Sequence, residues 1–199
     1  MLLLLSFMFL EVQPRLQSKF PPAIDIAYPN YGYKQQVNSF RDVDFKNFKL
    51  VILGVSGTAQ TSVQLKNGEY HETEDLGRTD ISLGPVSFLG KEDSGPNYAI
   101  LDISETDCGG SRTDTGITQV LRLERDHIVV QQQFTFDLSA PGTGTKLDKP
   151  SGILVITGRS NDDSANCCPE HVDVMRLRWN GYEFKEQSVE RVALAKQKN

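Results

Sequence analysis

Short runs of apolar residues alternate with polar ones from residue 40 onward, and Gly, Pro, Asn and Asp separate these runs. The runs are rich in Val, Ile, Thr and aromatic residues, a composition and alternation typical of half-buried strands. The pattern predicts a mainly β fold, a single antiparallel β-sheet or sandwich domain with little helix. The alternative is an α+β domain in which residues 189–194 form a helix on the sheet. Single predicted strands are residues 48–53, 81–89, 98–103, 153–157, 172–179 and 182–185. Two further runs contain a turn, namely residues 63–70, which turn at Asn67-Gly68, and residues 120–136, which fold back near Arg125-Asp126.

Two Asn-Gly pairs, Asn67-Gly68 and Asn180-Gly181, indicate β-hairpins, because a two-residue type I′ turn needs positive φ at both central residues. At the second pair, a two-residue loop places Trp179 opposite Tyr182 and fixes which side chains share a face. This face is apolar and is expected to lie in the core. Its predicted core residues are Met175, Leu177, Trp179, Tyr182 and Phe184.

Length and composition limit the function classes. A chain of 199 residues, 38% of them hydrophobic, can bury one sizeable core, which favours a single domain. Acidic residues outnumber basic ones, 26 to 21, and no run of Lys or Arg is long enough to follow a phosphate backbone, so we expect no nucleic-acid partner. No apolar stretch approaches the length of about 18 residues that a transmembrane helix needs.

The N-terminal region differs from the rest of the chain. Residues 2–10 are apolar apart from Ser6, which is typical of the hydrophobic part of an export signal. A buried N-terminal strand or helix is the alternative. We expect an exported protein, periplasmic or extracellular. The predicted organisation is an export signal or hydrophobic segment (1–22), an irregular proline-containing linker (23–38), a β-rich domain (39–190) and a polar tail (191–199).

The cysteines Cys108, Cys167 and Cys168 are an odd set of three. Cysteines of exported proteins are more often bridged than free, so we expect a disulfide from Cys108 to one of the adjacent pair. Such a bridge closes a loop of about 60 residues and is worth about 4 kcal/mol in the loop-entropy model. We favour Cys168, because Pro169 restricts its backbone to extended geometry. The bridge requires strands 98–103 and 153–157 to lie side by side, or one strand apart.

A metal site is the alternative use of the same residues. Cys108, Cys167, Cys168 and His171 together offer three sulfurs and one imidazole, a set that zinc accepts. Structural zinc sites usually space their cysteines by two to four residues, however, and adjacent residues of an extended chain point to opposite sides. Free thiols are a third possibility. We therefore expect no cofactor.

Catalytic motifs are missing from the sequence. Its three histidines are His71, His127 and His171, and it contains neither a G-x-S-x-G elbow nor an H-E-x-x-H helix motif. The remaining candidate for thiol chemistry is His171 with Cys167 or Cys168. We therefore expect no enzymatic activity.

Four stretches in this order resemble a family of uncharacterised exported bacterial proteins, common in cyanobacteria and related to mycobacterial-type envelope lipoproteins. They are residues 41–48 (RDVDFKNF), 65–70 (LKNGEY), 98–111 (YAILDI…DCGGS) and 166–184 (NCCPEH…RLRWNGYEF). The most specific pieces are Cys-Cys-Pro and Arg-Trp-Asn-Gly. The family's Asp-rich, Gly-rich turn before Ala99 is replaced here by FLGKEDSGPNY, which argues against calcium binding.

The resemblance covers about residues 40–184 and implies a compact β-rich envelope domain with no assigned activity. Together with the missing catalytic motifs, it predicts a non-catalytic domain that binds a protein, a glycan or another envelope component. The alternative is a metal-binding or thiol-active protein built on the Cys/His cluster.

Overall fold

The computed structural model describes residues 23–29, 31–53, 60–74, 77–90, 97–108, 113–161 and 168–194. These residues form antiparallel strands and two short 3-10 turns, η1 (Phe40–Asp42) and η2 (Phe45–Asn47). The mainly β prediction is confirmed. The α+β alternative is wrong, since residues 189–193 belong to a strand. No helix of the described part is long and apolar enough to span a membrane.

The largest sheet has seven strands in the order β1-β9-β8-β7-β6-β5, and β2 pairs with β9 on the same edge as β1. Its strands are β1 (Ile24–Ala27), β2 (Tyr31–Gln36), β5 (Glu69–Glu74), β6 (Gly77–Leu89), β7 (Tyr98–Asp107), β8 (Thr113–Glu124) and β9 (His127–Asp137). The four-stranded sheet comprises β10 (Gly144–Asp148), β11 (Ile153–Arg159), β12 (His171–Trp179) and β13 (Phe184–Ala193), and the two-stranded ribbon comprises β3 (Lys49–Leu53) and β4 (Gln60–Gln64).

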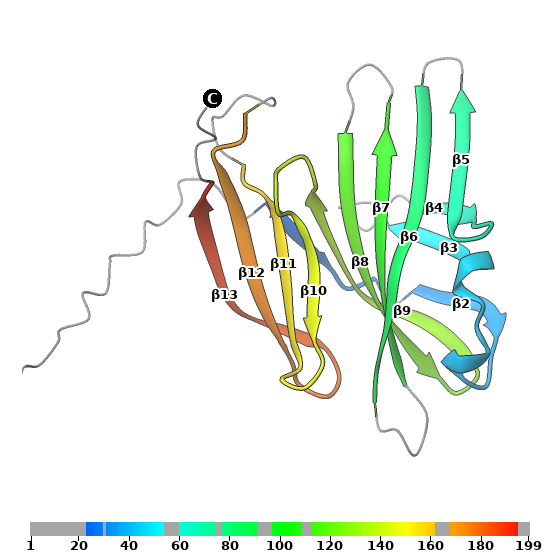
Figure 1. The fold of residues 1–199 in the computed structure, drawn as a ribbon. Helices are drawn as coiled ribbons and strands as arrows, with labels where there is room; N and C mark the ends of the chain where they lie inside the picture. The colour runs from blue at the N-terminus through cyan, green and yellow to red at the C-terminus, as the bar shows by residue number, and fades with distance from the viewer. Residues whose placement is uncertain are drawn as a thin grey trace, which may run out of the picture.

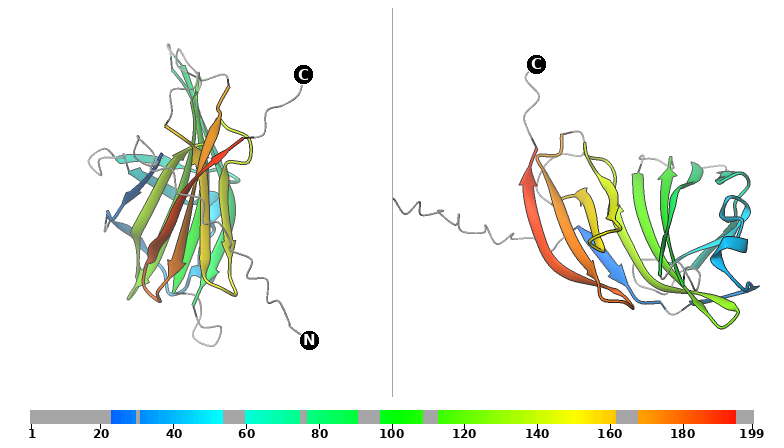
Figure 2. Two further views of the ribbon diagram at one scale, coloured as in Figure 1. Left: turned by 90° about the vertical axis from the view of Figure 1, so that its left-hand side faces the viewer. Right: turned by 60° about the horizontal axis from the view of Figure 1, so that its bottom comes forward.

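The seven-stranded sheet is the middle layer, with the four-stranded sheet on one side and the ribbon on the other (Figure 1; Figure 2, right). Strand β7 shows the division, because its successive side chains point to opposite faces. Ala99, Leu101 and Ile103 pack in the cluster on the ribbon side, whereas Ile100 packs in the cluster against the four-stranded sheet. The central strands are therefore apolar on both faces.

The N-terminal strands contradict the predicted linker at residues 23–38. Strands β1 and β2 pair with β9 and complete one edge of the large sheet. Pro29 lies between these two strands, where a missing N–H interrupts no ladder. Ser39, the predicted first residue of the β-rich domain, caps η1 by accepting a hydrogen bond from Arg41 N–H. The β-rich domain thus includes residues 23–29 and 31–38, while residues 1–22 lie outside the described part.

The two Asn-Gly turns have different outcomes. At Asn67-Gly68 both φ angles are positive (56° and 90°) and Lys66 pairs with Glu69, as the type I′ turn predicts. At Asn180-Gly181 the predicted register is wrong, because Trp179 pairs with Phe184 across the longer loop 180–183.

The side chain of Asn180 explains the longer loop. Its Oδ1 accepts hydrogen bonds from the N–H groups of Tyr182 and Glu183, each at 2.9 Å. Consequently Tyr182 is 51% exposed and is not the core residue that the sequence predicted. Trp179 is half-buried, whereas the other three predicted core residues, Met175, Leu177 and Phe184, are buried.

Consecutive glutamines of β9 hydrogen-bond to both outer layers. On the ribbon side, Gln133 Nε2 donates to Leu53 C=O at 2.6 Å, and Leu53 N–H donates back to Gln133 Oε1 at 3.1 Å. On the other side, Gln132 Nε2 donates to Phe184 C=O at 3.0 Å, and Phe184 N–H donates to Gln132 Oε1 at 2.8 Å. The middle sheet thus fixes β3 and the start of β13 by paired hydrogen bonds from glutamine side chains to the backbone.

Candidate functional site

The predicted Cys108–Cys168 disulfide is not formed. Cys108 directly follows β7 and Cys168 precedes β12, and no bridge links these two exposed residues. The physical reason is the topology, because β7 pairs with β6 and β8, whereas β11 belongs to the other large sheet. The strand arrangement that the bridge requires is therefore not formed. Cys167, the other candidate partner, lies outside the described residues.

The alternative metal site receives no support from the described residues. No group of three or more His, Cys, Asp or Glu side chains in the described ranges could hold a metal ion. This holds for the described members of the predicted set, Cys108, Cys168 and His171. Cys167 is not among the residues tested.

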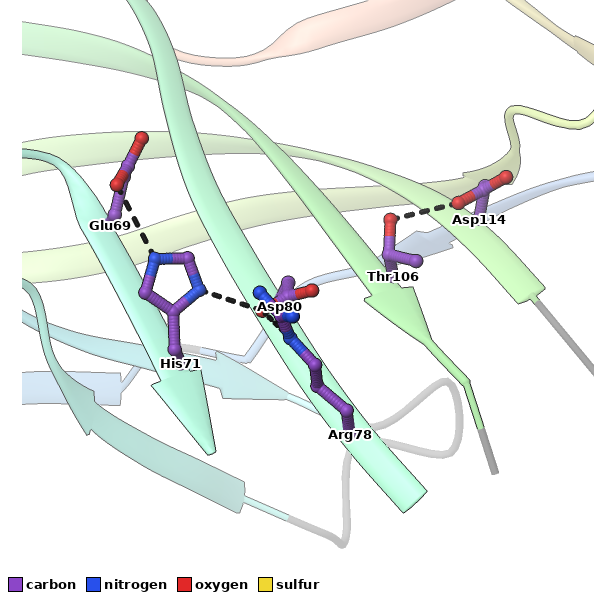
Figure 3. A network of polar contacts seen from close by, with 6 residues as sticks. All are labelled: Glu69, His71, Arg78, Asp80, Thr106 and Asp114. Atoms are coloured by element: carbon purple, nitrogen blue, oxygen red, sulfur yellow. Dashed lines mark hydrogen bonds and ion pairs between the residues drawn. The ribbon is translucent and has the colours of Figure 1, made fainter. Parts of the chain in front are cut away.

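A cross-strand polar network occupies the exposed face of the β5–β6 pair (Figure 3). His71 lies between two carboxylates, with Nδ1 2.6 Å from Asp80 Oδ1 and Nε2 3.4 Å from Glu69 Oε2. Arg78 Nε donates to the same Asp80 oxygen at 2.8 Å. The hydrogen bond to Asp80, followed by that to Glu69, raises the pKa of His71. An imidazole with both nitrogens engaged by carboxylates has no free nitrogen to accept a substrate proton, so we interpret this network as a surface ion-pair cluster.

The partly buried carboxyl of Asp102 lies between the seven-stranded and the four-stranded sheet. Burial raises the pKa of Asp102 on β7, while hydrogen bonds from Thr118 and Thr145 oppose this rise. Thr118 comes from the adjacent strand β8 and Thr145 from β10 of the other sheet, and their hydroxyl oxygens are 2.7 Å apart. Raised carboxyl pKa values also occur at catalytic sites. Here the hydroxyl partners give the group a structural role, because they connect the two sheets.

A polar cleft of about 440 Å³ opens where β1, β8, β9 and β11 meet. Its lining includes three carboxylates, Asp25, Asp114 and Asp137, together with Arg159. Several of these groups already have partners within the protein. Asp114 accepts a hydrogen bond from Thr106 at 2.8 Å, and Arg159 Nη1 donates to Ser139 at 3.3 Å. The capacity of this cleft to bind a ligand is reduced accordingly.

A second cavity, of about 380 Å³, lies where the loop between β12 and β13 reaches the large sheet. We call it the tyrosine pocket, and its lining residues are Tyr28, Arg122, Glu124, Gln131, Tyr182 and Glu183. Both tyrosines are unusually exposed for aromatic residues, Tyr28 by 57% and Tyr182 by 51%. The pocket therefore combines exposed rings with a few polar groups, a combination common in binding sites.

Strand β9 holds one wall of the tyrosine pocket in place. At a bulge in the β8–β9 pairing, Gln131 is an extra residue, and its Nε2 donates to Tyr182 C=O. The neighbouring Gln132 holds Phe184, so both glutamines fix the loop that carries Tyr182. The guanidinium carbon of Arg122 lies 5.5 Å from the centroid of the Tyr182 ring, a cation–π contact.

Two polar atoms at this pocket lack a hydrogen-bond partner among the described residues. They are Oε1 of Gln131, a residue only 8% exposed, and Nε of Arg122. The amide of Gln131 is oriented by its other end, because only the NH₂ group can donate to the Tyr182 carbonyl. Its oxygen is therefore an acceptor, and Arg122 Nε is a donor. Buried polar groups that stay unpaired are destabilising, and the burial of these two atoms places them behind the surface that a ligand would touch.

Sequence patterns did not predict this site. Tyr28 falls in the predicted linker and Tyr182 in the predicted core, and the glutamines of β9 belong to no predicted site. A usable signal was present, because the run Gln131–Gln133 interrupts an otherwise apolar strand, and buried amides require partners.

Comparisons with protein-family models, curated proteins and solved structures found no match to this chain.

Proposed function

We propose that this chain is a non-catalytic, exported domain that binds a cell-envelope component, a glycan or a protein, through the tyrosine pocket. The observation that carries the proposal is the pairing of two exposed tyrosines with the polar side chains of Arg122 and Glu124 in the lining of one cavity. A rigid sheet surface with aromatic side chains at its rim binds ligands at a low entropic cost.

Two further observations support the proposal. The apolar residues 2–10 favour export. Carboxylates engage two of the histidines, since His71 lies against Asp80 and His127 Nδ1 is 2.5 Å from Asp126 Oδ1. Among the described residues, the polar contacts of these two imidazoles are with carboxylates and not with a Ser, Thr or Cys nucleophile, which covalent catalysis needs.

The experiment measures how much purified protein co-sediments with envelope preparations from the source organism. Tyr182→Ala removes one exposed ring, and Phe88→Ala is the matched control because Phe88 is another exposed aromatic residue, on β6 and outside the pocket lining. We expect co-sedimentation of the wild type and of Phe88→Ala, and at least a tenfold loss for Tyr182→Ala. Equal binding of all three proteins would refute the role of the pocket.

A further inference from the structure

We propose that the ligand of the tyrosine pocket is a neutral, hydroxyl-rich ring, namely a sugar unit of a glycan. This inference rests on the proposed function and specifies the chemistry of the ligand. Shape, hydrogen bonding and charge each support it.

The rings provide the first reason. Tyr182 keeps 51% of its surface exposed although Arg122 contacts its ring, and Tyr28 is exposed by 57%. The C–H face of a sugar ring is apolar enough to pack on such a surface, while its hydroxyls stay at the ring edge. The cavity of about 380 Å³ is near the small end of the usual range for ligand sites, which suits a single sugar unit rather than an extended chain.

The polar groups of the lining provide the second reason. The phenol hydroxyls of Tyr28 and Tyr182, the guanidinium of Arg122 and the carboxylate of Glu124 bring donors and acceptors together in one cavity. A hydroxyl group can both donate and accept, so the neighbouring hydroxyls of a polyol suit such a mixed lining. A purely apolar ligand would remove water from these polar groups without replacing its hydrogen bonds, which disfavours it.

Charge provides the third reason. Arg122 Nη2 is 2.9 Å from Glu124 Oε2, and Lys185 Nζ is 2.6 Å from Glu183 Oε1, so both lining carboxylates already pair with a cation. An anionic ligand would lie near Glu124 and Glu183 without an unpaired cation to receive it. A cationic ligand would compete with Arg122, which already occupies the Tyr182 ring. A neutral ligand avoids both penalties.

The test is a titration of the full chain, followed by NMR chemical shifts, with neutral methyl hexosides and short neutral oligosaccharides. Glucuronate and glucosamine serve as anionic and cationic counterparts of similar shape. We expect neutral sugars to shift the signals of Tyr28 and Tyr182, with binding at least tenfold weaker for both charged sugars. Charged sugars that bind as tightly as neutral ones would overturn the inference.

Two variants separate ring stacking from loop stability. Tyr182→Phe keeps the ring and removes only the phenol oxygen, so we expect it to bind neutral sugars within about threefold of the wild type. Tyr28→Ala removes the other ring, outside the loop that Gln131 holds, and should weaken binding at least tenfold. Unchanged binding in Tyr28→Ala and Tyr182→Ala would place the sugar elsewhere and refute the inference.

The outcome also distinguishes this inference from the proposed function. Tyr182-dependent binding to envelope preparations that neutral sugars neither reproduce nor inhibit would refute the sugar ligand and leave the proposed function standing. Absence of any Tyr182-dependent binding to those preparations would refute the proposed function itself.

Discussion

The ring of Phe136 lies directly over the backbone of Gly116, its cross-strand partner in the β8–β9 pair. A Cβ atom at position 116 would be 2.4 Å from Phe136 Cε2, far inside normal contact distance. The absence of a side chain at this position therefore lets the ring occupy the space above β8. Phe136 also packs in the cluster between the two sheets, so this contact affects the main core.

Replacing Gly116 by Ala should lower the free energy of unfolding by about 1–3 kcal/mol, the usual cost of overpacking. Urea denaturation measures this change. Gly32→Ala is the control, because Gly32 is an exposed strand residue with no atom within 4 Å of an added Cβ. If both variants were equally stable, the Phe136 ring would be free to move aside.

Replacing Gln132 by Ala should be destabilising because it leaves the N–H and C=O groups of buried Phe184 without their partners. Each unsatisfied buried group costs about 1–3 kcal/mol. Denaturation of this variant should be compared with that of Gln187→Ala, which truncates an exposed glutamine of β13. A loss below about 0.5 kcal/mol for Gln132→Ala would show that water reaches Phe184.

We expect the free energy of unfolding to fall in acid because the carboxyl of Asp173 becomes protonated there. Burial raises the pKa of this carboxyl, but hydrogen bonds from Arg191, Ser160 and Ala23 N–H outweigh burial and hold the pKa below its usual value. A lowered folded-state pKa adds stability above the unfolded pKa of about 3.9, and this stability is lost as the pH falls through the folded pKa.

Asp173→Asn should therefore unfold more easily at neutral pH, by about 3–5 kcal/mol if its ion pair with Arg191 behaves as a buried one. Its stability should also vary less between pH 5 and about pH 2 than that of the wild type. Urea melts across this range provide the measurement, with the exposed Asp42→Asn as control. A parallel pH dependence of wild type and Asp173→Asn would assign the acid sensitivity to other groups.

Cys108 should react with a thiol reagent in the folded, unreduced protein, because it is exposed and not bridged to Cys168. Labelling followed by peptide mapping identifies the modified residue, and Cys108→Ser should remove this product. Protection of Cys108 that reduction abolishes would instead show a disulfide to Cys167. Bound zinc found by elemental analysis would revive the metal-binding alternative.

The sequence predicted the cores of most strands between residues 48 and 179 because side-chain alternation is a local property, but it did not predict β10. It also predicted the turn at Asn67-Gly68, where backbone geometry alone determines the outcome. It failed at Asn180, because the side-chain hydrogen bonds of that residue produced a longer loop and a different register. No local pattern distinguished these two turns.

The long-range pairings were the second failure. Residues 23–38 contain prolines and short alternations, and only β9, far along the chain, makes them strands. The tyrosine pocket depends on the same kind of contact, since Tyr28, Gln131 and Tyr182 come from three distant segments. A sequence pattern predicts which side chains share one face of a strand. It does not predict which faces pack together, because that depends on how the sheets assemble.

The hydrogen bond from Ala23 N–H to Asp173 spans 150 residues of sequence. Strand β1 lies near the N-terminus, but it pairs with β9, and Ala23 before it contacts β12. It can therefore reach its folded position only after both β9 and β12 have been synthesised. Contacts of such large separation slow folding, because the closure entropy is lost before any contact forms. During synthesis on the ribosome, the apolar face of β1 therefore stays exposed until most of the domain has emerged, and exposed apolar surface favours aggregation in that interval.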